Sequence, residues 1–224
     1  MATNKDLYQS IVSTLNPLQV QLVAVSKTKP NEDILELYHL GQKDFGENYV
    51  QELIDKAATL PTDIRWHFIG HLQTNKVKYI APFVHLIHGV DSEKLLIEIN
   101  KQSLKQNRVI DCLLQVHIAT EETKFGFDKQ AILDLVNSEN LATYKNIRIR
   151  GLMGMASLSD DQALLSQEFE DLKEIFDQTK YQMRSTHFDI LSMGMSADYA
   201  LAISKGSNMV RIGSLLFGNR NYNK

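Results

Sequence analysis

The sequence of 224 residues contains almost no cysteine: Cys112 is the one thiol, so no disulfide can form within the chain. Cys112 lies in the apolar run "VIDCLLQVHI", which favours a buried, unreactive thiol. Long apolar runs are also missing, because no stretch approaches the roughly 18 apolar residues that a membrane-spanning helix needs. The start "MATNKDLYQSIVSTLN" lacks the layout of a signal peptide. We therefore expect a soluble cytoplasmic protein that does not act at a membrane.

An excess of positive charge is likewise absent. The 24 Lys and Arg residues against 27 Asp and Glu residues give a formal net charge of -3. This charge offers nothing to attract a polyanion, so nucleic acid is not an expected partner. No low-complexity segment or linker rich in proline, glycine or serine divides the chain, and single α/β barrels reach this length. The sequence therefore predicts one domain over residues 1–224.

Short β-rich runs alternate along the chain with longer helical patterns. The helical segments, such as "NEDILELYHLGQK", open with acidic residues that suit the helix dipole. This alternation predicts an α/β fold, a single (β/α)8 TIM-type barrel with "KDLYQSIVSTL" as an extra N-terminal helix. A doubly wound open sheet is the structural alternative. The predicted strands begin at Leu22, Asp44, Arg65, Leu86, Asp111, Ile147, Phe188 and Met209.

Lys27 ends the first predicted strand, "LVAVSK". In a barrel of this type the functional groups gather at the carboxyl ends of the strands. A lysine between apolar walls is more often the neutral, nucleophilic amine, which condenses with carbonyl compounds. The alternative is an ordinary solvated lysine just past a strand, and this is the interpretation for Lys29, which precedes Pro30.

Two small-residue stretches near the C-terminus predict an anion site. "LSMGMSADYALAIS" is typical of a strand, a turn and a helix that begins near Ser196, with Asp198 in its first turn. "MVRIGS" ends the last predicted strand with Gly213 and Ser214, where the glycine lets the backbone approach an oxygen. The loops after strands seven and eight are the usual phosphate site of such barrels. A reactive lysine facing a phosphate site fits pyridoxal 5'-phosphate, and equally a phosphorylated sugar in an aldolase.

Six motifs in order resemble the pyridoxal phosphate homeostasis protein family (YggS/PROSC type). They are "LVAVSKTKP", "FGENYVQE", "WHFIGHLQTNK", "GLMGM", "LSMGMSADYALAI" and "MVRIGSLLFGNR", and they run from about Leu22 to Arg220. The resemblance implies a barrel similar to the N-terminal domain of alanine racemase, with pyridoxal phosphate bound as a Schiff base on Lys27. It also implies that the phosphate is held by Ser192, Ser196, Gly213 and Ser214.

Two further residues are assigned by the same resemblance. Arg211, in "VRIG", is expected to face the pyridine nitrogen, where a cation disfavours protonation of the ring. The alternative for Arg211 is a barrel-wall arginine paired with a carboxylate. Asn48, in "FGEN", is expected to contact the ring or its hydroxyl, and a cap for the helix "YVQELIDKAA" is its alternative or additional role.

The resemblance implies a protein that binds pyridoxal phosphate and buffers it or delivers it to apo-enzymes, without catalysis of its own. A racemase of the alanine racemase type is the alternative, and weak racemase activity remains compatible with this interpretation. Racemisation with two bases needs a second acid or base opposite the lysine, which the related racemase takes from a further domain and another subunit. This sequence ends at "FGNRNYNK", soon after the eighth predicted strand. We expect a non-catalytic monomer.

The histidines occur at spacings that metal sites use on helices, His67 with His71 and His85 with His88. Here both pairs fall on strand and loop, where this spacing does not bring two imidazoles together, so we predict no metal site. His67 is instead expected to be a polar neighbour of the cofactor. Met153 and Met155 are expected to fill the core.

The sequence departs from the family pattern around the fifth strand and after the second. His117 and Phe125 stand where the family often has asparagine and a small residue, and Tyr49 stands where arginine is frequent. Lys124, on the loop after the fifth strand, is a candidate to take the aldehyde transiently as the ligand leaves, with a solvated loop lysine as its alternative.

Overall fold

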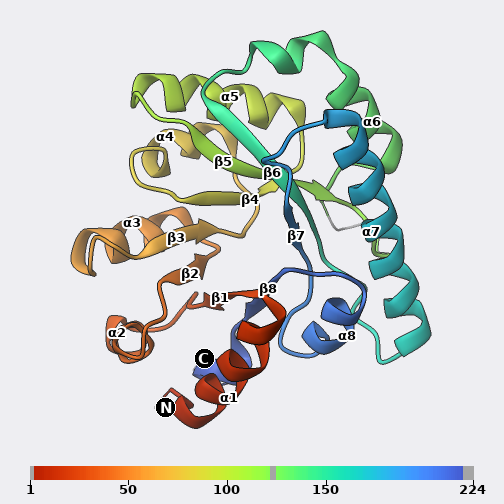
Figure 1. Ribbon diagram of the computed structural model, residues 1–224. Helices are drawn as coiled ribbons and strands as arrows, with labels where there is room; N and C mark the ends of the chain where they lie inside the picture. Colours follow the sequence, from red (N-terminus) through yellow and green to blue (C-terminus); the bar gives the residue numbers. More distant parts are fainter. Residues whose placement is uncertain (1–2, 122–124, 219–224) are drawn as a thin grey trace.

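Eight parallel strands close into a barrel in the order of the sequence (Figure 1). The computed structural model describes residues 3–121 and 125–218, so Lys124 lies outside the described residues. The closed barrel confirms the predicted fold class and rules out the open sheet. The strands are β1 (Gln21–Val25), β2 (Asp44–Glu47), β3 (Arg65–Phe68), β4 (Leu86–Val90), β5 (Ile110–Val116), β6 (Ile147–Gly154), β7 (Ile190–Ser192) and β8 (Met209–Ile212).

Helices follow the strands around the outside of the barrel (Figure 1). They are α2 (Asn31–His39), α3 (Val50–Thr59), α4 (Val77–Ile80), α5 (Glu93–Lys105), α6 (Lys129–Asn137), α7 (Gln162–Met183), α8 (Tyr199–Ser204) and α9 (Ser214–Phe217), with the 3-10 turns η1 (Asn16–Leu18), η2 (Thr74–Lys76) and η3 (Glu139–Thr143).

The extra N-terminal helix α1 (Lys5–Leu15) has the predicted bounds. The Asn4 side chain accepts a hydrogen bond from the Leu7 N–H at 3.0 Å, which caps its first turn. The Asn4 N–H in turn donates to the Leu216 carbonyl at 2.8 Å. This bond ties the start of α1 to α9, the element that directly follows the last strand.

The core has two parts, one between the barrel and its helices and one inside the barrel. β4 and β5 are buried along their whole length, as expected for parallel strands that are covered on both faces. Cys112 on β5 is buried as predicted, and burial raises the pKa of its thiol. Among the described residues, no helix is long and apolar enough to cross a membrane. The apolar part of the barrel interior consists of Val23, Leu86, Leu113, Met153 and Met209.

Gly151 allows β6 and β7 to approach closely. The register of β5 against β6 shifts between Cys112 and Leu113, and Gly151 adopts a φ of 154°. A Cβ atom at this position would lie 1.8 Å from the Ile190 carbonyl oxygen on β7. The strand pairing that closes this side of the barrel therefore depends on a residue without a side chain.

Two C-terminal elements differ from the sequence prediction. α8 begins at Tyr199 and not near Ser196, because a turn comes first in which the Asp198 carboxylate accepts from the Met195 N–H at 2.5 Å. The predicted last strand stops at Ile212, and α9 follows after Gly213, whose carbonyl accepts from the N–H of Phe217 at 2.9 Å.

Candidate functional site

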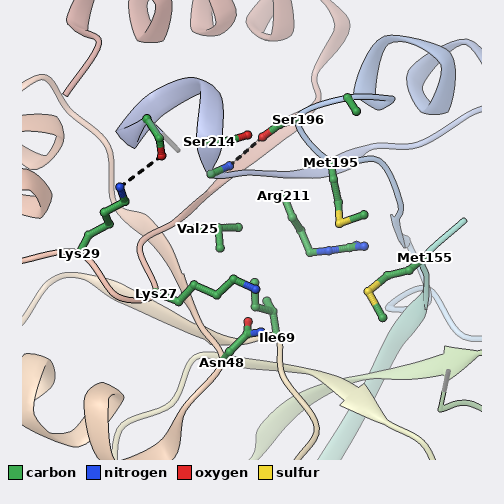
Figure 2. Close-up of a pocket in the computed structure, with 13 residues that line it drawn as sticks. Val25, Lys27, Lys29, Asn48, Ile69, Met155, Met195, Ser196, Arg211 and Ser214 are labelled. Carbon is green, nitrogen blue, oxygen red and sulfur yellow. Dashed lines mark hydrogen bonds between the residues drawn. The ribbon is translucent and has the colours of Figure 1, made fainter. Parts of the chain in front are cut away.

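A cavity of about 560 Å³ opens at the carboxyl ends of the strands (Figure 2). Its size is within the range of small-molecule sites. The cavity brings together most of the predicted site residues, although Ser192 does not line it. The lining residues are Val25, Lys27, Lys29, Asn48, Ile69, Met155, Met195, Ser196, Ala197, Arg211, Gly213, Ser214 and Gly218.

β1 ends at Val25, so Lys27 lies two residues beyond the strand that was predicted to end on it, and it is half-buried. Figure 2 shows its amine end pointing into the cavity beside Asn48 and Ile69. The walls near it are largely apolar, with Val25 on its own strand and Ile69 after β3. Primary amines are nucleophiles toward carbonyl carbon, so the site can bind an aldehyde covalently.

The turn after β1 is held by two carboxylates. Thr28 has a left-handed backbone with φ 64°, which is unusual for a β-branched residue. Its N–H donates to Glu52 at 2.5 Å, and the Ser26 hydroxyl donates to Glu47 at 2.6 Å. Because both neighbours of Lys27 are anchored in this way, the direction in which Lys27 leaves the strand is fixed.

A buried lysine joins these two carboxylates, which the sequence analysis missed. The Lys56 amine donates to Glu47 at 2.8 Å, to Glu52 at 2.6 Å and to the Ser26 carbonyl at 2.8 Å. Burial raises the pKa of Glu47, whose side chain is completely inaccessible. A signal existed in the sequence: Lys56 comes three residues after Leu53, on the buried face of α3.

The structure corrects two interpretations from the sequence, a helix cap for Asn48 and a solvated side chain for Lys29. The Asn48 Oδ1 atom is buried and has no hydrogen-bond partner among the described residues. α3 begins at Val50 without a side-chain cap, so the capping role is wrong. Lys29 is not a solvated lysine, because its amine donates to the carbonyls of Phe217 at 2.7 Å and Gly218 at 3.2 Å.

The predicted anion site lies where β7 and β8 end. The Ser196 hydroxyl accepts from the Gly213 N–H at 3.2 Å, which joins the two small-residue loops. A Cβ on Gly213 would lie 3.2 Å from the Val25 carbonyl oxygen, so the glycine lets this loop approach the end of β1 closely. Ser214 lines the same end. Hydroxyl and N–H donors at one end of a cavity suit a phosphate group.

Arg211 reaches into the cavity from inside the barrel and is 4% exposed. Its Nη1 donates to the Ser192 carbonyl at 2.9 Å and hydroxyl at 2.6 Å, and its Nη2 donates to the Gly154 carbonyl at 3.0 Å. Burial lowers its pKa to about 10, so the guanidinium is still charged at neutral pH. Among the described residues it bonds to neutral oxygens and to no carboxylate, which corrects the ion-paired alternative.

Ser192 lies behind Arg211 and is completely buried. Its hydroxyl contacts Arg211 and, at 3.3 Å, the Nδ1 atom of His88. The phosphate role expected for Ser192 stays a prediction.

The histidines occupy other places than expected. His67 does not line the cavity: it is completely buried inside the barrel, 2.9 Å from His88 and 3.0 Å from Asp44. His71 is bonded to Asp91 at 2.9 Å, and its ring stacks on Phe125. Met153 fills the barrel interior as expected, whereas Met155 lines the cavity.

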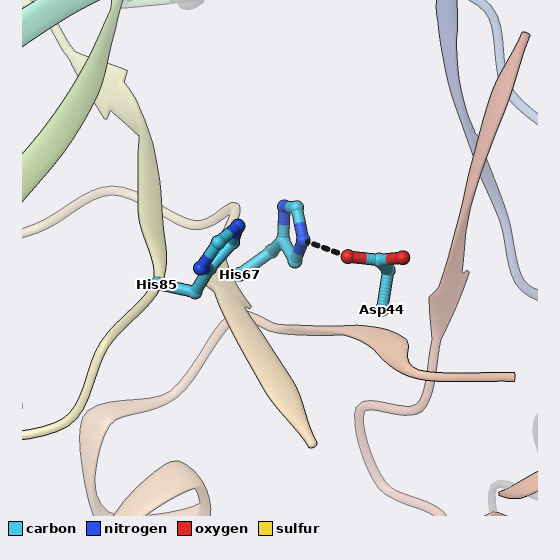
Figure 3. A group of neighbouring side chains, drawn as sticks. All are labelled: Asp44, His67 and His85. Atoms are coloured by element: carbon cyan, nitrogen blue, oxygen red, sulfur yellow. Dashed lines mark hydrogen bonds and ion pairs between the residues drawn. The ribbon is translucent and has the colours of Figure 1, made fainter. Parts of the chain in front are cut away.

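Asp44, His67 and His85 place their ligand atoms within 4.8 Å of one another (Figure 3). Arg65 already donates to both oxygens of Asp44, at 2.7 and 2.5 Å. His67 bonds to one of the same oxygens. Because the protein's own hydrogen bonds account for this group, we assign no metal ion to it.

The chemistry that the cavity can support is limited by its titratable groups. Among the lining residues within the described ranges, these groups are Lys27, Lys29 and Arg211, with no carboxylate, histidine, tyrosine or cysteine. The cavity thus offers a nucleophilic amine at one end and anion donors at the other. Within residues 3–121 and 125–218, the lining includes no second side chain of the kind that exchanges protons near neutral pH.

Comparison with known proteins agrees with this geometry. The chain matches the family described as alanine racemase, N-terminal domain, over residues 5–221. It is 40% identical over 208 residues to the pyridoxal phosphate homeostasis protein of Pasteurella multocida, a match that covers 92% of this chain and 88% of the relative.

Solved structures show the same barrel. PipY of Synechococcus elongatus, solved with pyridoxal phosphate bound, has a TM-score of 0.85 and 34% sequence identity, with 95% of this chain and 99% of PipY covered. Alanine racemase from Bartonella henselae has a TM-score of 0.72 at 18% identity, with 97% of this chain and 59% of the racemase covered. The racemase comparison shows a shared fold alone.

Proposed function

The chain belongs to the pyridoxal phosphate homeostasis protein family, and from this premise we propose that it holds pyridoxal 5'-phosphate on Lys27 and buffers or delivers it. The observation that carries the proposal is that the Lys27 amine and the hydroxyls of Ser196 and Ser214 line one cavity. The ligand has the matching groups, an aldehyde and a phosphate on opposite sides of a ring. In a relative, PipY, pyridoxal phosphate is bound.

The residues present fit the cofactor. When bound, its aldehyde condenses with the Lys27 amine to a C=N bond, with release of one water molecule. The hydroxyls of Ser196 and Ser214 donate to phosphate oxygens, and Gly213 leaves room for them. The Asn48 side chain lines the cavity and its amide oxygen lacks a hydrogen-bond partner among the described residues, which supports a contact from Asn48 to the ring or its hydroxyl.

Arg211 determines whether the pyridine nitrogen of the bound cofactor is protonated. Three of its hydrogen bonds go to protein oxygens, and a guanidinium has five N–H groups. The remaining donors serve the pyridine nitrogen, which a neighbouring cation keeps unprotonated. An unprotonated ring is a weak electron sink, so this arrangement favours storage of the cofactor over carbanion chemistry.

Absence of catalysis is part of the proposal. A racemase needs a second acid or base opposite the lysine, and the described lining residues include none of the usual kinds. The curated relative at 40% identity carries the name of a homeostasis protein. The role that fits is to keep a reactive aldehyde covered and to pass it to apo-enzymes that need it.

The proposal is tested by loading the protein with pyridoxal phosphate and incubating it with L- and D-alanine, L-serine and L-lysine in deuterated water. Loading should produce the visible absorption of a Schiff base, and α-deuterium measured by NMR should accumulate no faster than with free cofactor at equal concentration. Absence of the visible band would contradict the binding proposal. Exchange that is faster than with free cofactor and is lost in Lys27→Ala would make the racemase alternative correct.

A further inference from the structure

A continuous line of buried polar side chains crosses the interior of the barrel behind the cavity. It runs from Asp44 on β2 through His67 on β3 and His88 on β4 to Ser192 on β7. The successive atoms are 3.0, 2.9 and 3.3 Å apart. Ser192 then accepts from Arg211 at 2.6 Å. The line therefore connects the base of the barrel to the guanidinium in the cofactor cavity. Figure 3 shows its first link, from Asp44 to His67.

This polar line is costly for a barrel core. The interior of such barrels is usually filled by branched apolar residues, and a buried polar group destabilises the fold unless it is hydrogen-bonded. His67, His88 and Ser192 have no exposed surface. Each of them has a partner on both sides along the line. These hydrogen bonds explain why the fold tolerates the three buried polar side chains, but they do not explain what the side chains do.

The directions of the hydrogen bonds follow from the two ends of the line. Asp44 is ionised, because hydrogen bonds from Arg65 and His67 outweigh its burial and hold its pKa well below the usual range. A carboxylate only accepts, so His67 carries a proton on Nε2. While His67 is neutral, its Nδ1 accepts from His88 Nε2–H, and His88 Nδ1 accepts from the Ser192 hydroxyl.

One additional proton on His67 reverses this order. His67 Nδ1 then donates to His88, which moves its own proton from Nε2 to Nδ1 and donates to Ser192. His88 and Ser192 keep their proton counts, and only His67 gains one. Burial and the charges of His67 and Arg211 lower the pKa of His88 well below its ordinary value. His88 therefore passes on the change of direction without storing the charge.

The reversal changes how strongly the Ser192 hydroxyl oxygen accepts a hydrogen bond from Arg211. A hydroxyl that donates a hydrogen bond is a stronger acceptor than one that receives two. With neutral His67 the Ser192 oxygen donates to His88 and holds Arg211 well. With cationic His67 it receives donors from both sides and holds Arg211 less well, while the barrel interior carries one more positive charge. The released Arg211 donor favours the unprotonated ring nitrogen that faces it, and the added positive charge favours binding of a cofactor that is negatively charged as a whole.

We propose that His67, His88 and Ser192 are positioning residues for Arg211, and that protonation of His67 at the base of the barrel tightens binding of the cofactor at its mouth. The proposal rests on the proposed function, because it takes the phosphorylated cofactor as the ligand that faces Arg211. Linkage is reciprocal, so bound cofactor favours the protonated form of His67. Imidazole is the side chain whose ordinary pKa, about 6.5, lies nearest neutrality.

Other charged groups lie around the line from Asp44 to Ser192, and one of them provides a control residue. Asp44 on β2, Arg65 on β3, Asp111 on β5 and Arg211 on β8 all act on the histidines. His85, just before β4, lies against His67 with 5.4 Å between the ring centroids. His85 is exposed and forms no link of the line, so it is the matched control. Burial and the charge of His67 lower the pKa of His85.

The first test uses the protein without cofactor. Imidazole nitrogens are followed by ¹⁵N NMR from pH 5.5 to 8.5, with His67→Gln and His85→Gln used to assign them. As His67 gains its proton, His88 should stay neutral and change from the Nε2–H to the Nδ1–H tautomer. A His88 that keeps one tautomer while His67 titrates, or a His67 that does not titrate in this range, overturns the proposal.

The second test measures the Kd for pyridoxal phosphate over the same pH range by fluorescence titration. As the pH falls from 8.5 to 5.5, the affinity of the parent for pyridoxal phosphate should rise by about fivefold or more relative to that of His67→Gln. A factor of about five is at the lower end of coupling between two sites. His85→Gln should keep this gain in affinity, because His85 forms no link of the line. Glutamine at position 67 keeps an amide between Asp44 and His88 but cannot titrate.

The two proposals fail in different ways. If all three proteins bind the cofactor with superimposable pH profiles, the coupling to His67 is wrong and the proposed function stands. If the parent does not bind pyridoxal phosphate at any pH, the proposed function is wrong, and with it the coupling to the cofactor.

Discussion

Two lysines only two positions apart line the same cavity but have different surroundings. Lys27 points into the cavity (Figure 2), whereas the Lys29 amine is bound to the carbonyls of Phe217 and Gly218. The first placement could be predicted from a strand that ends on a lysine. The second could not, because the partners of Lys29 lie 188 and 189 residues further along the chain.

At the same scale, the phosphate end depends on two hydroxyls. We expect Ser196→Ala combined with Ser214→Ala to weaken binding of pyridoxal phosphate, since a hydrogen bond to a charged group contributes about 1.5 to 3 kcal/mol. Pyridoxal, which lacks the phosphate, should bind the double variant and the parent almost equally in the same absorption titration.

A matched control for this pair is Ser204→Ala, because the Ser204 hydroxyl donates to the Leu201 carbonyl within α8 and does not line the cavity. Ser204→Ala should bind both ligands as the parent does. Equal weakening of both ligands in the double variant would show that the two serines do not contact the phosphate.

At the scale of elements, predictions that depend on local pattern were accurate. α1 has the predicted bounds because its cap and apolar face lie within the segment itself. The start of α8 was wrong by three residues, because a turn in which the Asp198 carboxylate accepts from the Met195 N–H comes before the regular helix. Such turn chemistry overrides the helical periodicity that the sequence shows.

Gly151 provides a test of how the strands close the barrel. We expect Gly151→Ala to lower the free energy of unfolding by more than about 3 kcal/mol, because the new methyl group would collide with the Ile190 carbonyl oxygen on β7. Urea denaturation measures this change.

The control is Gly41→Ala, where φ is 101° and nothing lies within 4 Å of the added Cβ. That variant has backbone strain alone and should lose about 1 to 2 kcal/mol. Equal losses in the two variants would mean that β6 and β7 tolerate the methyl group and that the close approach does not limit stability.

At the scale of the whole molecule, barrel closure creates contacts that no local pattern contains. His67 meets Asp44 across 23 positions, His88 across 21, and Ser192 meets His88 across 104. Spacing along the chain was informative only about the pairs His67–His71 and His85–His88, and it gave no sign of the partners that His67 and His71 have in the structure. The barrel and the cavity could be predicted because strand ends converge at one mouth, whereas the polar interior could not.

The most direct test of the account is to find which amine carries the cofactor. The protein is loaded with pyridoxal phosphate, reduced with borohydride to fix the C=N bond, digested and mapped by mass spectrometry, with Lys27→Ala and Lys29→Ala treated in parallel. The account predicts the pyridoxyl group on Lys27 in the parent and in Lys29→Ala, and no label at the site in Lys27→Ala. A label on Lys29 or Lys124 of the parent, with Lys27 unmodified, would contradict it.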